Sequence, residues 1–233
     1  MTANVNVSSA EDSSRHVAPP GGAAADGDAA RIARLAAGDR AALAELFDPH
    51  RARLYRMVAF RLDRRLRARV DPEDVLQEAY LDAERRVEHY LRDTSRSLFV
   101  WFRLIVAQTL IDVHRRHLAA DKRDAGRDRS LAGTPSPSTS ACLADELLGD
   151  GSTPSQAAIR GERTRQLEAA LAAMSDIDQE IIALRHFEDL SNAEVAEALE
   201  LSPTAASNRY VRALARLKEI LSSFPDFAAT PPG

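Results

Sequence analysis

The sequence contains few of the residues that stabilise secreted proteins and β-sheets. Cys142 is the one cysteine among 233 residues, so no disulfide can form within the chain and a reducing, cytoplasmic location is expected. Aromatic residues make up only 5%, and no segment alternates apolar and polar residues as a strand does. No apolar run approaches the roughly 20 residues that span a bilayer, and no hydrophobic signal core is present. We therefore predict an all-α protein with no membrane partner.

Motifs typical of enzymes are also missing. There is no glycine-rich phosphate loop, no nucleophile motif and no HExxH sequence, so neither an enzyme nor a cofactor is predicted. His114, His117 and Cys142 are residue types that bind zinc, but no fourth ligand follows at a useful spacing. We predict no metal site.

Charge is distributed unevenly along the chain. The net charge is −4, which excludes a uniformly basic nucleic-acid-binding protein. Arginines are dense between Arg51 and Arg69, whereas acids gather at 71–88 and 145–150. The Arg61–Arg69 segment fits a longer helix, a DNA contact or a solvated stretch, and we favour the solvated stretch.

Composition divides the chain into two small helical domains with a flexible linker. Residues 1–28 contain too few apolar residues to offset the conformational entropy that is lost on folding, so a disordered tail is predicted there. A helical domain is expected at 29–118 and a second at 155–223, followed by a C-terminal tail at 224–233. The intervening 119–154 are charged and then rich in Ser, Thr, Pro and Gly, which is typical of a linker. Within it, only 141–148 has the pattern of an ordered segment.

The first domain begins with apolar residues at helical spacing between Arg31 and Val58, interrupted at Gly38 and Asp39, which predicts two helices. Asp71 and Pro72 then predict the N-cap and first turn of a helix that runs to about Leu91.

A third strong helical pattern covers Leu98 to Leu118. It is apolar nearly all round at its start, so Trp101 and Phe102 are expected in the core. Polar residues gather on one face near its end, where they fit either a nucleic-acid contact or an ordinary solvated helix end: Gln108, Asp112, Arg115 and Arg116.

In the second domain, helices are predicted at 155–173, 177–187, 193–199 and 203–222, with Asp176 and Gln179 as a capping box on the second. The last two have the pattern of a helix-turn-helix. Ser191 and Glu194 fit a capping box, and Ser202 with Pro203 restarts the chain as helix.

The final helix has an apolar face and a basic face. As the second helix of a helix-turn-helix, it would lie in the major groove of DNA. Side chains near its start would then reach base edges, and the later arginines would contact phosphate. Asn pairs with adenine and Arg with guanine in such contacts. The predicted DNA-contacting set is Ser202, Thr204, Ala205, Asn208, Arg209, Arg212 and Arg216.

Two separated segments resemble the bacterial sigma factor family of the sigma-70 superfamily, specifically its extracytoplasmic-function (ECF) type. DPEDVLQEAYLDAERRVEHY is similar to the polymerase-binding helix of region 2, and SLFVWFRLIVAQTLIDVHRRH to its promoter-melting helix. MSDIDQEIIALRHFEDLSNAEVAEALELSPTAASNRYVRALARLKEIL resembles region 4. The segment RLDRRLRARVDPEDVLQEAY also resembles members of the family that are common in planctomycete-type bacteria.

The resemblance implies a subunit that directs core RNA polymerase to promoters. Region 2 would dock on the clamp helices of the largest polymerase subunit through Asp74, Gln77 and Glu78 and would capture the −10 element, while region 4 would read the −35 element. An anti-sigma protein is a further partner of this kind of factor. Matching positions for −10 binding lie in the loop 92–97, which would receive an unstacked base, and on the helix after it: Arg92, Ser95, Arg96, Gln108, Asp112, Arg115 and Arg116.

Two features depart from the family pattern, and a second function is considered. The basic Arg61–Arg69 segment extends the connection before Asp71. Glu200 stands where the family often has a turn glycine, so a different turn is expected there. The alternative function is a helix-turn-helix transcriptional regulator with an N-terminal helical sensing domain. That alternative does not explain the segment DPEDVLQEAY or the aromatic helix after it.

Overall fold

The structure is a computed structural model that describes residues 23–124, 139–148 and 154–224. Over these ranges it contains helices and no strand, which confirms the all-α prediction. The elements are α1 (Ala23–Ala36), α2 (Ala41–Phe47), η1 (Asp48–His50), α3 (Arg51–Arg61), α4 (Pro72–Arg92), α5 (Leu98–Asp124), α6 (Thr139–Leu148), α7 (Pro154–Leu171), α8 (Asp176–Ile182), the π-helical η2 (Ala183–Phe187), α9 (Asn192–Ala198) and α10 (Pro203–Ser222).

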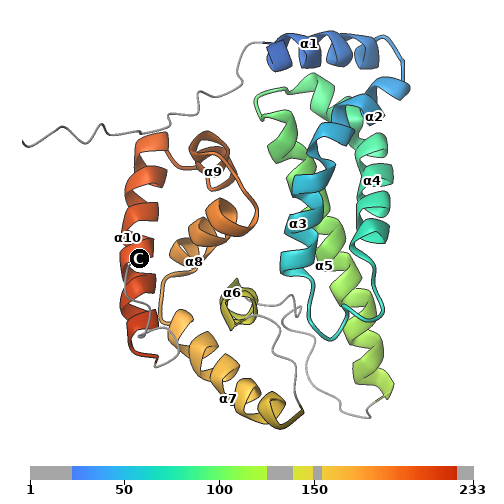
Figure 1. Cartoon of the computed structure of the whole chain (residues 1–233). Helices are drawn as coiled ribbons and strands as arrows, with labels where there is room; N and C mark the ends of the chain where they lie inside the picture. The colour runs from blue at the N-terminus through green and yellow to red at the C-terminus, as the bar shows by residue number, and fades with distance from the viewer. Residues whose placement is uncertain (1–22, 125–138, 149–153, 225–233) are drawn as a thin grey trace, which may run out of the picture.

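The helices gather into two halves, one formed by α1 to α5 and one by α7 to α10, with α6 between them (Figure 1). None of the helices within the described ranges is long and apolar enough to cross a membrane. Residues 1–22 and 225–233, which make up most of the predicted tails 1–28 and 224–233, lie outside the described residues, as does most of the predicted linker.

The N-terminal half follows the predicted pattern with two differences. α1 begins at Ala23, inside the range predicted as a tail. Gly38 has a φ of +98°, a left-handed conformation that glycine adopts without a Cβ clash, and it turns the chain where a break was predicted. The second predicted helix is divided into α2 and α3 by the 3₁₀ turn η1, which contains Pro49.

The two long helices of this half begin as predicted and carry its core. The Asp71 carboxylate caps α4 by accepting a hydrogen bond from the Glu73 N–H at 2.9 Å. On α5, Phe102 is fully buried with its ring edge-on to Phe47 at 5.0 Å. Trp101 is also buried, so the core role predicted for both aromatic residues is confirmed.

The C-terminal half has the four predicted helices, with one capping error. The Ser175 hydroxyl, rather than Asp176, caps α8 by accepting from the Asp178 N–H at 3.3 Å. The Gln179 amide instead donates to the Met174 carbonyl at 3.1 Å, so the predicted capping box is wrong. Both Ser175 and Asp176 are good N-cap types, and the side chain that reaches the free N–H decides between them.

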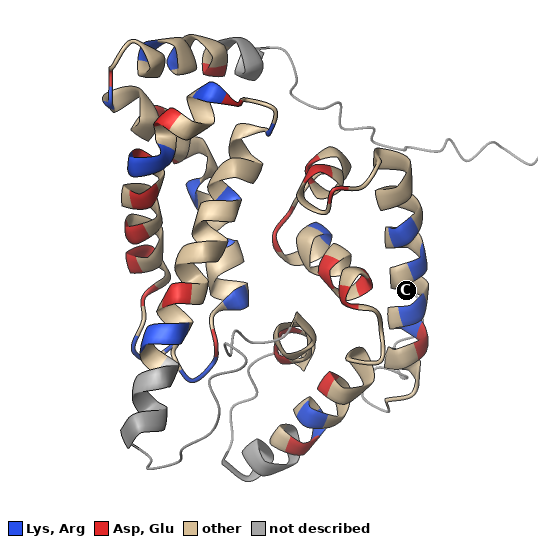
Figure 2. Cartoon of the chain, turned by 180° about the vertical axis from the view of Figure 1, so that it is seen from behind, with Lys and Arg blue, Asp and Glu red and all other residues tan. Residues whose placement is uncertain are grey.

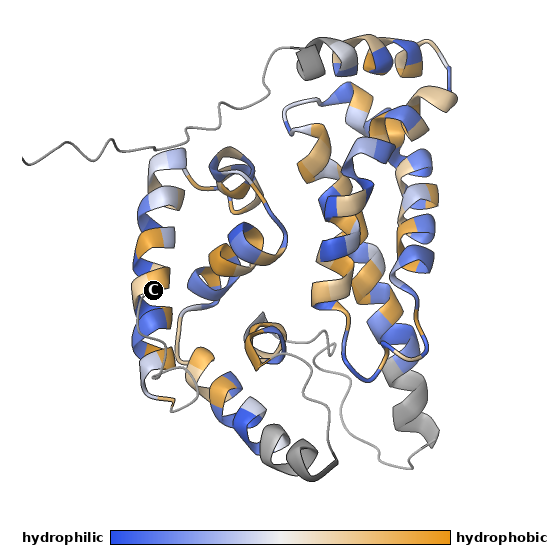
Figure 3. Cartoon of the chain, viewed as in Figure 1, coloured by the Kyte–Doolittle hydropathy of each residue, from blue (hydrophilic) through white to orange (hydrophobic). Residues whose placement is uncertain are grey.

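Buried apolar residues from both halves belong to one continuous core. Apolar residues line the inward-facing sides of the helices (Figure 3). Phe60 on α3 and Phe187 at the end of η2 stack with ring planes 8° apart and centroids 4.8 Å apart. α6 packs against α3, α7 and α8, so this linker helix contacts both halves. The ordered segment expected at 141–148 is confirmed as part of α6.

Candidate nucleic-acid interface

The helix-turn-helix at α9 and α10 is built by reciprocal caps. The Ser191 hydroxyl accepts from the Glu194 N–H at 3.3 Å, while the Glu194 carboxylate accepts from the Ser191 N–H at 2.8 Å, which confirms the predicted capping box. Ser202 caps α10 by accepting from the Ala205 N–H at 3.2 Å. Free helix N–H groups are thereby satisfied at both starts.

The turn between the two helices is left-handed at Glu200, whose φ is +54°. Its neighbour Leu201 donates its N–H to the Ala196 carbonyl at 2.8 Å, which closes the turn. The Asn192 amide donates to the Pro203 carbonyl at 2.9 Å and holds the two helices together. A conformation that favours glycine is therefore occupied by a glutamate.

α10 has the two faces that its sequence predicts. Ala206, Ala213 and Ile220 are buried against the rest of the half. The apolar residues Tyr210, Leu214, Leu217 and Leu221 are partly buried against the same core. The opposite face exposes most of the predicted DNA-contacting set, namely Ser202, Thr204, Ala205, Asn208, Arg212 and Arg216. Figure 2 shows basic residues along this helix.

Arg209 differs from its neighbours because it has a partner within the protein. Its Nη1 lies 2.9 Å from Asp178 Oδ1 on α8, and both side chains are about one-third exposed. Arg216, by contrast, pairs with Glu219 on the same helix, where both side chains are mostly exposed. Arg209 must leave or share Asp178 in order to contact a base.

The predicted −10 residues fall into two groups. Arg92, the last residue of α4, lies 3.8 Å from Glu88, and in the loop after it the Asp93 carboxylate accepts from the Ser95 N–H at 3.0 Å. The third loop residue, Arg96, lies 3.4 Å from Glu200 of the helix-turn-helix. The loop is therefore shaped by its own contacts and touches the other half of the molecule.

The second group lies on one face near the end of α5. Asp112 accepts from the Gln108 amide at 3.3 Å and lies 3.5 Å from Arg115. Arg116 is held by Glu78 of α4 at 2.6 Å. The resemblance implies that Arg116 contacts the −10 element and that Glu78 contacts polymerase, but in the structure these two residues pair with each other.

The exposed side of α4 adjoins a hollow of about 430 Å³. Asp74 and Gln77 are exposed on it, as is Leu81, which is 50% exposed. Phe47, Leu76, Gln77, Tyr80 and Leu81 line much of the hollow. This surface combines an apolar depression with a polar rim.

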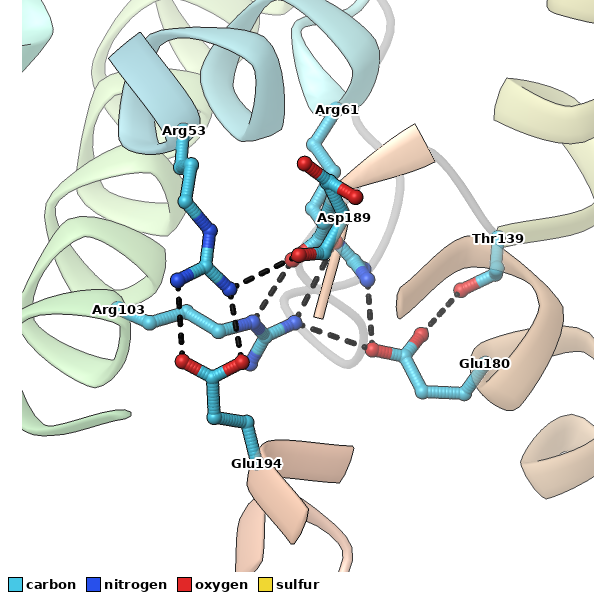
Figure 4. A network of polar contacts seen from close by, with 8 residues as sticks. Arg53, Arg61, Arg103, Thr139, Glu180, Asp189 and Glu194 are labelled. Carbon is cyan, nitrogen blue, oxygen red and sulfur yellow. Dashed lines mark hydrogen bonds and ion pairs between the residues drawn. The ribbon is translucent and has the colours of Figure 1, made fainter. Parts of the chain in front are cut away.

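A network of ion pairs between the halves was not predicted from the sequence. Arg53 of α3 donates to both carboxylate oxygens of Glu194 at 2.8 and 3.0 Å. Arg103 Nε donates to Glu188 at 2.7 Å, and Arg61 donates to the same carboxylate. Figure 4 shows these arginines converging with acids of the C-terminal half, among them Glu180 of α8 and Glu194 of α9. Arg61 was expected in a solvated stretch, and that expectation is wrong because the partners lie on the other half.

Glu188 is 1% exposed. Burial opposes its charge, but the guanidinium groups of Arg61 and Arg103 outweigh that effect and hold the pKa of Glu188 below its usual value. Arg103 was missed although it interrupts the apolar run LFVWFRLIVA. A single charge in such a run is itself a signal of a buried partner.

Of the residues considered as metal ligands, His114 and Cys142 are buried and His117 is exposed. The Nε2 atom of the buried His114 accepts from the Asp63 N–H at 3.1 Å. Burial lowers the pKa of His114, which favours this neutral acceptor form. Among the residues that the structure describes, no group of three or more His, Cys, Asp or Glu side chains is arranged to hold a metal ion.

Comparisons with known proteins match both halves. Residues 164–217 match the family described as Sigma-70, region 4. The chain is 24% identical over 191 residues to the ECF RNA polymerase sigma factor SigW of Bacillus subtilis, covering 82% of this chain and 95% of that protein. It is 29% identical over 197 residues to the ECF RNA polymerase sigma factor SigD of Mycobacterium tuberculosis, covering 84% and 85%. Among solved structures, CnrH in complex with the cytosolic domain of CnrY matches with a TM-score of 0.48 and 21% identity, covering 85% of this chain and 99% of that chain.

Proposed function

We propose that this chain, which is an ECF RNA polymerase sigma factor of the sigma-70 family, divides its task among three surfaces. One reads the −35 element, one captures the −10 element and one binds core polymerase. The observation that carries the proposal is the exposed basic face of α10 on a complete helix-turn-helix, in a chain whose N-terminal half also matches sigma factors. A regulator with an unrelated sensing domain would not match over both halves.

The −35 surface is the exposed face of α10. Thr204, Ala205 and Asn208 lie in its first two turns, where a recognition helix reaches base edges. Arg212 and Arg216 lie further along and suit phosphate contacts. We assign Arg209 to base reading, in exchange for its pair with Asp178. Ser202 supports the first turn as its cap.

The polymerase surface is the outer side of α4. Asp74 and Gln77 are exposed beside the hollow that Leu81 borders. An apolar depression with a polar rim suits a protein partner, and we assign it to the clamp helices of the largest polymerase subunit. Glu78 contributes through an exchange of its partner Arg116.

The −10 surface comprises the loop 92–97 and the end of α5. Arg92, Ser95 and Arg96 would hold an unstacked base and its neighbouring phosphates. Flipping costs a few kcal/mol, which such contacts offset. The second group on α5 follows the adjoining DNA strand: Gln108, Asp112, Arg115 and Arg116.

Three finer assignments complete the proposal. We place the factor's work in the cytoplasm, where core polymerase is found. Control by an anti-sigma protein is included because the resemblance implies it. The wording RLDRRLRARVDPEDVLQEAY supports placing the chain with factors of planctomycete-type bacteria.

Mapping transcript starts after overexpression of the chain tests the proposal. We expect a set of new start sites that share two upstream sequence elements, and the same promoters should be transcribed in vitro by core polymerase only when the chain is added. DNA binding and transcriptional change that do not require the chain to join polymerase would instead indicate a regulator.

Charge reversal on α4 tests the polymerase surface. Asp74→Lys with Glu78→Lys should lower capture of core polymerase by at least about tenfold. The control is Glu88→Lys, which reverses one acidic charge on the same helix at a residue whose pairs are 3.7 and 3.8 Å long and exposed. Equal capture by the double variant and the control, with unchanged helical content, would refute this assignment.

A further inference from the structure

The contact between the two halves contains several ion pairs in addition to its apolar packing. Three arginines of the N-terminal half, Arg53, Arg61 and Arg103, face the acids of the C-terminal half (Figure 4). Arg61 also lies 2.6 Å from Glu180, whose carboxylate accepts from the Thr139 hydroxyl of α6 at 3.0 Å. The acid-rich side of the C-terminal half faces the N-terminal half, whereas α10 is on the far side (Figure 2).

Neither half satisfies these charges alone. Glu188 is 1% exposed and Arg103 is 7% exposed where they pair across the contact. Both groups regain water when the halves separate, so opening exchanges ion pairs for hydration. Opening an apolar interface of the same size would expose apolar surface to water, without any gain of hydration by charged groups. The apolar part of the contact includes the stacked pair Phe60 and Phe187.

The contact also engages the last two residues of the loop 92–97, while Arg92 and Ser95 stay exposed. The Glu197 carboxylate of α9 accepts from the Ser97 N–H at 2.7 Å, and Glu200 lies 3.4 Å from Arg96. Carboxylates of the helix-turn-helix thus occupy an N–H donor and a guanidinium, which are the groups that a phosphate would use. The α10 residues assigned to the −35 element stay exposed in the same arrangement.

We propose that this interface is a reversible ionic clasp in which acidic residues of the helix-turn-helix occupy Arg96 and Ser97 of the −10 loop, and that opening the clasp frees these two residues. The clasp is defined by Arg53, Arg61 and Arg103 against Glu180, Glu188 and Glu194. The identification of DNA as the ligand of the freed loop residues rests on the proposed function. The existence of the clasp does not rest on it. A segment with linker composition joins the halves, so the covalent chain does not by itself fix them together.

Cys142 provides a reporter of opening because it is the one cysteine in the sequence. It is 7% exposed and lines a cavity of about 180 Å³ between the halves. Phe60 and Leu62 of the N-terminal half form part of the wall, and Thr164 and Glu168 of the C-terminal half form another part. Opening removes one wall, whichever half retains α6. Burial raises the pKa of the thiol to about 11, so the closed form reacts slowly.

The experiment measures the rate at which a thiol reagent labels Cys142 in the full chain, without polymerase or DNA. Glu188→Gln keeps the side-chain shape but removes the shared charge. Loss of a charge-assisted hydrogen bond should raise the labelling rate roughly tenfold to hundredfold. The matched control is Glu219→Gln, which removes the same charge from the same half at an exposed pair within α10. The control should label at the wild-type rate.

A second variant keeps the test decisive if Glu188→Gln loses helical content by circular dichroism. Arg53→Gln breaks the clasp at its edge, where the side chain is 23% exposed, and leaves Glu188 with both of its arginines. It should speed labelling severalfold and increase the radius of gyration in solution scattering. Wild-type rates for Arg53→Gln and for a folded Glu188→Gln would overturn the clasp. This result would leave the transcription tests untouched, and failure of those tests would leave the clasp standing.

Discussion

Asp178→Asn should increase promoter affinity, because it releases the arginine proposed to read a base. Arg209 Nη1 and Asp178 Oδ1 are 2.9 Å apart, with side chains 33% and 28% exposed. A pair this exposed to water is worth about 0.2–1 kcal/mol. If Arg209 gives up this pair on DNA, its removal should tighten promoter binding by roughly 1.4- to 5-fold.

The same substitution should slightly destabilise the free protein. Asp178 lies in the first turn of α8, where a negative charge interacts favourably with the helix dipole. Losing that interaction costs about 0.3–1 kcal/mol in addition to the ion pair. Higher affinity together with lower stability separates a released DNA contact from a general stabilisation of the helix-turn-helix.

The assay is the Kd of the polymerase complex for a promoter found by start-site mapping, at one fixed salt concentration. Asp82→Asn is the control, because it removes one acidic charge from α4, far along the chain from the helix-turn-helix. A companion variant, Arg209→Ala, should reduce discrimination at one base pair by about 1–3 kcal/mol. Equal gains for Asp178→Asn and Asp82→Asn would refute the reasoning, since net charge alone would then explain the effect.

Three stability predictions concern other parts of the fold. Phe102→Ala should lower the free energy of unfolding by about 3–5 kcal/mol in urea titrations, because the ring is fully buried against Phe47; a loss below about 1 kcal/mol would contradict this packing. His114 has a lowered pKa in the folded state, so its neutral form contributes stability that is complete above the unfolded pKa of about 6.5 and is lost as pH falls through and below that value. His114→Gln should remove this part of the pH dependence measured by thermal unfolding. Glu200→Gly should raise the free energy of unfolding by up to about 1 kcal/mol, and with it the melting temperature, because φ is +54° there. A clear decrease in melting temperature would show that the Arg96 pair matters more than backbone conformation.

Helix starts were predictable because their signals lie within a few residues of each other. The pairs Ser191 with Glu194 and Ser202 with Pro203 each combine a cap with a residue in the following turn, and the structure places them as predicted. The error at Asp176 has the same local origin. Ser175 precedes it directly, and sequence patterns do not resolve a competition between adjacent caps that differ by one residue.

Side-chain partners across the fold were not predictable in the same way. Helical periodicity correctly placed Arg209 away from the main packing residues, but its partner Asp178 is 31 residues earlier on another helix. Arg61 belongs to a dense basic stretch that favours solvation, yet its partners lie 119 and 127 residues later. Charge density along the chain does not carry the information about which surfaces meet.

Arg103 shows how far a sequence argument can extend toward such a contact. A guanidinium within an apolar turn of α5 requires a compensating acid, because an unpaired buried charge costs several kcal/mol. The sequence contains 35 acidic residues, and the order of residues along the chain does not say which of them pairs with Arg103. Three-dimensional packing selects Glu188, which also meets the charge of Arg61. Glu180 also meets both arginines, but its side chain is 23% exposed whereas that of Glu188 is 1% exposed. Because water screens the buried pairs less, neutralising Glu188 should weaken the interface more than neutralising Glu180.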